Sequence, residues 1–280
     1  MNAEIRTNRR RGSGHALVHV ALGLGALAML VPFVWMVLTA FMTMGESTQV
    51  PPVLFPKNPQ WKNFHDATAL LPFMTFYFNT IVTTVAKTAG QLLLCSMAAY
   101  AFARIDFPGR NVLFVMALSV LMVPGQVFII PQYMLMKHFG WLNSLTALIV
   151  PGLFSAFGTF LLRQFFMSLP KELEEAAKID GCNHFRIYWQ IMLPLAKNGL
   201  IALAIFVILW SWNDFLWPMI VNNSPDKLPL SVGLSLLRGE HTTNYPVLMA
   251  GTLLAVWPML VIFLIFQRSF IQGIALTGSK

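Results

Sequence analysis

The sequence predicts an all-α membrane protein that crosses the bilayer several times, and two observations carry that prediction. Of the 280 residues, 56% are hydrophobic and only 11% are charged, whereas soluble domains contain roughly 25% charged residues. The apolar residues gather into six segments, each close to the roughly 20 residues that a helix needs to cross the hydrocarbon core. The net charge of +8 comes from basic residues in short loops beside these segments, a pattern typical of membrane topology rather than of nucleic-acid binding.

Six membrane helices are expected in order along the chain. The first, residues 15–43, follows four arginines and is longer than the apolar core of a signal peptide, which is about 7–15 residues, so we expect it to be retained. Residues 45–72 contain five prolines and are expected to form an external loop without a continuous helix. The other expected spans are residues 73–103, 112–136, 145–162, 200–221 and 247–266.

The distribution of basic residues predicts that both termini are cytoplasmic. With the N-terminus inside, the internal segments hold thirteen lysines and arginines and the external segments hold five, and cytoplasmic loops carry the excess. We therefore expect residues 1–14 to form a cytoplasmic arm, residues 15–268 a transmembrane domain, and residues 269–280 a cytoplasmic tail. The polar loop over residues 170–197 lies in the cytoplasm on this topology.

This polar loop carries an ordered pattern. Apolar and small residues at helical spacing predict a helix that opens at Pro170 and presents a small-residue face. Gly181 supplies the backbone freedom for a sharp turn, and bulky apolar residues then resume the helical spacing. Two short helices joined at a glycine elbow are expected. The residues that set the two patterns are Leu173, Ala176, Ala177 and Asp180, then Phe185, Tyr188, Trp189 and Met192.

The same loop resembles the EAA loop of the permease subunits of ABC importers. The resemblance is carried by Glu175, Ala176, Ala177, Gly181, Ile191, Leu193 and Pro194 at the spacing of that motif. Further segments resemble the maltose-type permease subunit of carbohydrate-uptake importers, and the final residues, 274–280, differ from the usual ending of that family. The matching segments are residues 79–80, 98–104, 107–110, 212–218, 248–251 and 267–273.

The resemblance implies an ABC importer permease fold in the cytoplasmic (inner) membrane of a bacterium or archaeon. Besides the lipid bilayer, it implies three kinds of partner: a second permease subunit, two copies of an ABC ATPase subunit and an extracytoplasmic solute-binding protein. The substrate would be a sugar, an oligosaccharide, or a related polyol or glycerol phosphate compound. ATP and Mg would be held by the ATPase, with no cofactor on this chain. The implied ATPase-coupling residues are Glu174, Glu175, Ala176, Ala177, Asp180, Gly181, Ile191, Leu193 and Pro194.

Four residues inside the expected spans are candidates for a substrate pathway: Lys87, Trp212, Asn213 and Asp214. Polar groups are costly in lipid and usually face a cavity or another helix, and sugar sites commonly combine hydrogen bonds with aromatic faces. For Asn213 and Asp214 the alternative is an interhelical contact at a kink before Pro218. For Lys87 three alternatives stay open: it faces the pathway, pairs with Asp214, or extends toward the membrane surface.

The sequence gives no sign of an enzyme. It lacks G-x-x-x-x-G-K-[ST], whose backbone amides and lysine hold ATP phosphates, and the histidines and the two cysteines show no metal-ligand spacing. The alternative function is an ion-coupled secondary transporter, which usually has intramembrane acids at matched positions in two halves. Asp214 has no such counterpart in the first half. A membrane-embedded enzyme is a second alternative, and the absence of a catalytic set argues against it.

Overall fold

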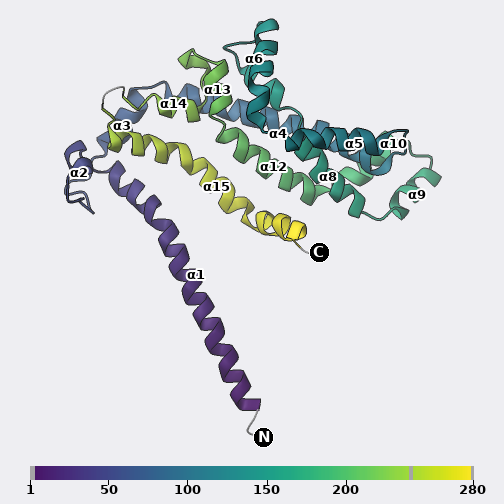
Figure 1. Ribbon diagram of the computed structural model, residues 1–280, viewed down its shortest axis with the longest axis horizontal. Coiled ribbons are helices and arrows are strands. Elements are labelled where there is room, and N and C mark those ends of the chain that lie inside the picture. The colour runs from purple at the N-terminus through teal and green to yellow at the C-terminus, as the bar shows by residue number, and fades with distance from the viewer. Residues whose placement is uncertain (1–3, 240–241, 279–280) are drawn as a thin grey trace. The chain divides into compact units, whose positions relative to one another are not determined.

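The computed structural model describes the backbone of residues 4–239 and 242–278 and the side chains from Val18 to Gln267 apart from that gap. Within these residues every regular element is a helix (Figure 1). The chain divides into two compact units. Unit 1 contains the chain up to Leu70 together with Leu237–Leu254, and unit 2 contains Leu71–Leu236 together with the segment from Ala255 onward.

The described helices provide enough apolar length for up to six membrane crossings. Four segments are long and apolar enough by themselves, and two further pairs of helices meet the same test but are bent by 98° and 76°. The count therefore reaches six when each bent pair forms one span, and the predicted all-α polytopic fold is confirmed. The four single segments are Val18–Ala40, Phe73–Arg104, Leu145–Ser168 and Tyr245–Gln267, and the bent pairs are Arg110–Met122 with Gly125–His138 and His184–Leu195 with Lys197–Trp212.

Unit 1 is held together by a small core of alanines and aromatic rings. It comprises α1 (Glu4–Ala40), α2 (Met44–Thr48), α3 (Lys62–Ala69) and the first turns of α15 (Tyr245–Gly278). Thr43 and Glu46 form a reciprocal capping box at the start of α2. Backbone N–H groups of Thr43 and Lys57 hold the pKa of Glu46 below its ordinary value. The side chains of α1 from Val18 to Val34 are exposed in this chain, as expected of a helix that lipid or another subunit covers.

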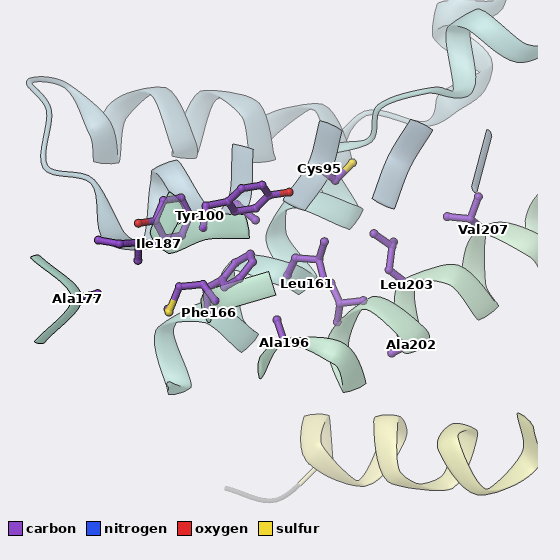
Figure 2. Packing of buried hydrophobic residues seen from close by; sticks show 14 residues of the cluster. Cys95, Tyr100, Leu161, Phe166, Ala177, Ile187, Ala196, Ala202, Leu203 and Val207 are labelled. Carbon is purple, nitrogen blue, oxygen red and sulfur yellow. The ribbon is translucent and has the colours of Figure 1, made fainter. Parts of the chain in front are cut away.

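The core of unit 2 lies among α4 (Phe73–Arg104), α8 (Ala156–Ser168) and α12 (Lys197–Trp212). Side chains from these helices point toward one another in Figure 2, where Cys95, Leu161 and Leu203 lie in the same cluster. Glycines let the helices approach closely: a Cβ at Gly158 would lie 3.1 Å from both Cys95 and Leu203, and one at Gly199 would lie 2.6 Å from Phe165. Such small residues at helix contacts are typical of membrane proteins.

The expected third span, residues 112–136, is broken near its middle. The first part is α5 (Arg110–Ser119) with the 3₁₀ turn η1 (Val120–Met122), and the second is η2 (Gly125–Phe128) with α6 (Ile129–His138). Val123 lies between them in an extended conformation, with φ −95° and ψ 127°. Proline disfavours the helical conformation of the residue before it, so Pro124 explains the break.

The expectation of one continuous span over residues 200–221 is wrong. α12 ends at Trp212, and α13 (Leu216–Val221) begins after three non-helical residues. Pro218 lies in the first turn of α13, where its missing N–H costs nothing, but its ring would collide with the carbonyl of Asp214 in a continuous helix. The remaining elements of unit 2 outside the polar loop are α7 (Leu145–Ile149), η3 (Val150–Gly152), η5 (Pro225–Lys227) and α14 (Leu230–Ser235).

Candidate functional site

The polar loop forms two helical segments around a left-handed glycine, as the sequence predicts. The first helix is α9 (Glu172–Ile179), which begins two residues after the expected start at Pro170. Gly181 has φ +78°, and the N–H groups of Gly181 and Cys182 donate to Lys178 O and Ala177 O, respectively. This bonding pattern is a Schellman motif, which ends a helix and favours glycine at the left-handed position. The second segment runs through α10 (His184–Ile187), the π-helix η4 (Tyr188–Met192) and α11 (Leu193–Leu195).

The loop has an inward and an outward face. Glu174, Ala177, Ile187, Tyr188 and Met192 are buried against the chain's own helices. On the other face, Glu175, Ala176, Asp180 and Gly181 are exposed. The loop also carries exposed large apolar side chains: Ile179 is 87% exposed, Phe185 65% and Trp189 52%. Apolar groups this exposed beside polar ones are typical of a surface that another protein covers.

Glu174 and Ala177 differ in position from the other expected coupling residues. Ala177 lies in the hydrophobic core cluster, at its edge in Figure 2, so its small side chain lets α9 approach the body of the protein. Glu174 forms a buried ion pair with Arg104, with 3.7 Å between Oε1 and Nε. Both residues therefore make internal contacts, whereas the expectation assigned them to a surface for another subunit. Of the others, Ile191 and Leu193 are half-buried and Pro194 is exposed.

Arg104 connects three helices at the end of α4 that lies beside the polar loop. Its Nε and Nη2 donate to the carbonyl of Phe166, and Nη2 also donates to that of Leu169. Phe166 lies in the last turn of α8 and Leu169 follows its last residue, where backbone oxygens have few partners within the helix. Because Glu174 lies on α9, one guanidinium holds α9, α8 and α4 together. The sequence did not predict this junction, because Arg104 was expected only as part of the family segment 98–104. Its position at the end of an apolar span is the signal that could have pointed to a role in joining helices.

An aromatic cluster fixes the second half of the loop to α4. The hydroxyls of Tyr188 and Ser96 are 2.7 Å apart. The ring of Tyr100 lies 5.4 Å from that of Tyr188 and 5.9 Å from that of Phe166, within the range of favourable aromatic contacts. The inward face of the loop is therefore anchored by both an ion pair and aromatic packing. The exposed rings of Phe185 and Trp189 stack on each other and lie 6.4 and 6.2 Å from the ring of Tyr188, at the edge of this cluster.

The candidate pathway residues separate into three environments. Lys87 Nζ lies 3.1 Å from Asp214 Oδ2, which selects the pairing alternative for Lys87. Asn213 is exposed and donates to Leu209 O at the end of its own helix. Trp212 donates from Nε1 to Ala255 O and lines an apolar cavity of about 510 Å³ together with Tyr77 and Trp257. Only Lys87 and Asp214 meet at a polar site.

A row of buried polar side chains along α4 was not foreseen. Gln91 donates to Gly152 O and accepts from Ser155, and Thr84 bonds Ser211. At the other end, Asn79 donates to the carbonyls of Asp226 and Leu228. The spacing of three or four residues is the helical signal that could have revealed this row. Its members are Asn79, Thr80, Thr83, Thr84, Lys87 and Gln91.

Comparison with known proteins identifies the family. The family described as "Binding-protein-dependent transport system inner membrane component" matches residues 91–275. The chain belongs to this family. Membership in a family of inner membrane components accounts for the long apolar helices.

Individual relatives cover most of the chain. The arabinooligosaccharides transport system permease protein AraQ of Halalkalibacterium halodurans is 39% identical over 208 residues, which are 74% of this chain and 75% of the relative. The sn-glycerol-3-phosphate transport system permease protein UgpE of Pectobacterium atrosepticum is 34% identical over 264 residues, 91% and 94% of the two chains. A solved bacterial ABC transporter involved in the import of the acidic polysaccharide alginate is 25% identical, with a TM-score of 0.82 and coverage of 94% and 97%.

Proposed function

We propose that this chain is the permease subunit of an ATP-driven ABC importer for a sugar, an oligosaccharide, or a related polyol or glycerol phosphate compound. The relatives are permeases of such systems, and the chain matches them over most of its length. A second permease subunit completes the pathway, two ATPase subunits bind ATP and Mg, and an extracytoplasmic binding protein delivers the substrate.

The observation that carries the proposal is the division of the polar loop into an anchored and an uncovered face. The exposed ridge of Ile179, Phe185 and Trp189 supplies apolar area for a partner. Glu175 adds a charge on the same exposed side and pairs with a basic residue of the ATPase. The anchored face transmits motion, because Glu174 and Arg104 link the loop to α4 and α8.

In this proposal the loop acts as a lever. ATP-driven closure of the two ATPase subunits moves the loop, and the helices joined to it turn the pathway from an inward-facing to an outward-facing state. The topology is the one with both termini in the cytoplasm, supported by the excess of basic residues on that side. The pairing of Glu174 with Arg104 makes Glu174 a positioning residue for the lever.

Mild detergent extraction of the tagged chain from its native membrane tests the proposal. We expect an ABC ATPase to co-purify near one copy per permease subunit, with a second permease of similar size. Glu175→Ala should reduce the ATPase recovered, whereas Glu172→Ala, an exposed acid one turn earlier on the same helix, should not. Recovery of a solitary chain that takes up solute in response to a proton gradient would instead establish the secondary-transporter alternative.

A further inference from the structure

The ion pair between Lys87 and Asp214 lies on a small polar cavity in unit 2. The cavity has a volume of about 260 Å³ and is lined by Lys87, Gln91, Gly152, Val207, Trp210, Ser211 and Asp214. Drug-sized ligands occupy pockets of about 300–1,000 Å³, so this cavity suits a single sugar ring or a similarly small part of a larger molecule. It lies where α12 ends before α13 begins, and the backbone oxygen of Asp214 there accepts a hydrogen bond from Ser231 Oγ at 2.6 Å.

The polar lining retains hydrogen-bonding capacity. Lys87 has three N–H donors, of which the described contacts use one, to Asp214 Oδ2. The side chain of Asp214 is 27% exposed, compared with 9% for that of Lys87, so the carboxylate is the more accessible partner. An adjacent donor and acceptor of opposite charge can bind two neighbouring hydroxyl groups, one to each partner, and hydrogen bonds to charged groups are the strong ones.

One wall of the cavity is aromatic, and its face is supported by other rings. Trp210 is 53% exposed and packs against Phe157, with ring centroids 5.2 Å apart, and against Phe206, at 5.7 Å. These contacts fix the orientation of the indole. Polar groups beside a supported aromatic ring are the combination that binds the polar edge and the apolar face of a sugar.

The lysine is held in place by a glycine. A Cβ at Gly152 would lie 2.8 Å from Lys87 Cε and 2.9 Å from Cδ, so the absence of a side chain there makes room for the lysine stem. Gln91 fixes the same segment by donating to Gly152 O at 2.8 Å. The position of the ammonium is therefore set before any ligand binds, which lowers the cost of binding.

The charge of the lining distinguishes substrate classes. Lys87 and Asp214 are the charged residues of the cavity, and their charges cancel. A phosphate or carboxylate that approached Lys87 would also lie close to Asp214, and a like charge at that distance is unfavourable. An uncharged hydroxyl-rich group satisfies both partners without this repulsion.

We propose that this cavity is a substrate subsite that binds an uncharged, hydroxyl-rich ring between the Lys87–Asp214 pair and the face of Trp210. The proposal rests on the proposed importer function. It narrows the substrate class to neutral sugars and excludes glycerol phosphate. It also assigns direct substrate contact to this subunit.

Uptake by cells that express the complete transporter tests the subsite. The probes are radiolabelled arabinotriose, a neutral sugar, and sn-glycerol 3-phosphate, an anion. The central variant is Lys87→Met with Asp214→Leu, because replacing both charges leaves neither unpaired in the membrane. The control is Asp106→Asn, which removes an ion pair of this chain to Arg110 outside the cavity. Co-purification of the ATPase with each variant is measured in parallel and reports on assembly separately from substrate binding.

The wild type and the control are expected to favour arabinotriose over glycerol phosphate. The double variant is expected to retain its ATPase and to lose about tenfold or more of arabinotriose uptake, as the loss of hydrogen bonds to charged groups predicts. Asp214→Asn, which keeps the shape of the side chain, should reduce arabinotriose uptake as well. Undiminished uptake by the assembled double variant would show that the pair is only a helix contact, and a wild-type preference for glycerol phosphate would overturn the neutral class. If no ATPase co-purified with the wild type, the importer function itself would be contradicted.

Discussion

Two ion pairs each join a basic side chain of α4 to an acidic side chain outside this helix, but their surroundings differ. Lys87 and Arg104 are 17 residues apart on this helix, about 25 Å along its axis. The side chains of Arg104 and Glu174 are 4% and 8% exposed, and the arginine also binds two backbone carbonyls. The Lys87–Asp214 pair has a more accessible carboxylate and lies on a cavity. The first pair is enclosed by the protein, whereas the second has capacity for a ligand.

The comparison indicates which pair is structural. A guanidinium has a fixed fork of five donors and suits a permanent junction, whereas an ammonium is a compact charge whose three donors can change partners. Removing one partner of an enclosed pair leaves a buried charge, and a more open pair can be relieved by solvent or ligand. The pair beside the polar loop is therefore expected to be a permanent junction, and the Lys87–Asp214 pair to exchange hydrogen-bond partners when a ligand binds.

The largest effect is expected from Arg104→Gln. Glu174 Oε1 accepts no hydrogen bond from the described residues, so the charge of Arg104 is what compensates its burial. Removing that charge should destabilise the protein by about 3–5 kcal/mol, measured as a lower unfolding temperature of the purified complex. Arg110→Gln is the matched control, because its partner Asp106 is 94% exposed, and exposed pairs contribute about 0–1 kcal/mol. Equal unfolding temperatures for the two variants would contradict the structural role.

A smaller effect is expected from Gly181→Val. No atom lies within 4 Å of a Cβ at this position, so the substitution meets open space and its cost comes from the backbone φ of +78°. A non-glycine residue held there costs about 1–3 kcal/mol, which should shift the loop and lower substrate-stimulated ATP hydrolysis while the protein still inserts. Gly181→Asn should be milder, because asparagine tolerates the left-handed region. Equal substrate-stimulated ATP hydrolysis in the wild type and both variants would show that the turn at Gly181 has no role in coupling.

The smallest effect is expected from Gly152→Ala. The added methyl group must displace the stem of Lys87, with Cε at 2.8 Å from its position, but a lysine chain can adjust. A reduction of arabinotriose uptake by a few-fold, corresponding to about 1 kcal/mol, is expected with unchanged ATPase co-purification. Gly125→Ala is the control, since nothing lies within 4 Å of a Cβ there. Unchanged uptake in the Gly152 variant would show that the position of Lys87 is not critical.

The sequence predicts local features better than it predicts which face of a helix is covered. The glycine elbow follows from residue spacing, because glycine adopts the left-handed backbone found at Gly181 at the lowest cost. The inward position of Glu174 does not follow, since Glu174 and Glu175 are adjacent acids and the direction of each depends on Arg104 from another helix. The break after Trp212 could have been read from Pro218, but the apolar residues around it satisfy the length of a continuous span.

The measurement that tests the coupling loop most directly uses Cys182, which follows the elbow and is half-buried, whereas Cys95 is fully buried. A thiol reacts as its thiolate and needs access to the reagent, so an impermeant maleimide should label Cys182 in inverted membrane vesicles and leave it unmodified in intact cells. Binding of the ATPase should slow the labelling, because the bound subunit covers the turn that contains Cys182. Cys182→Ser should abolish the signal and confirm its source. Labelling of Cys182 from outside intact cells would contradict the topology, and a rate in vesicles that is the same with and without the ATPase would contradict the docking of this loop.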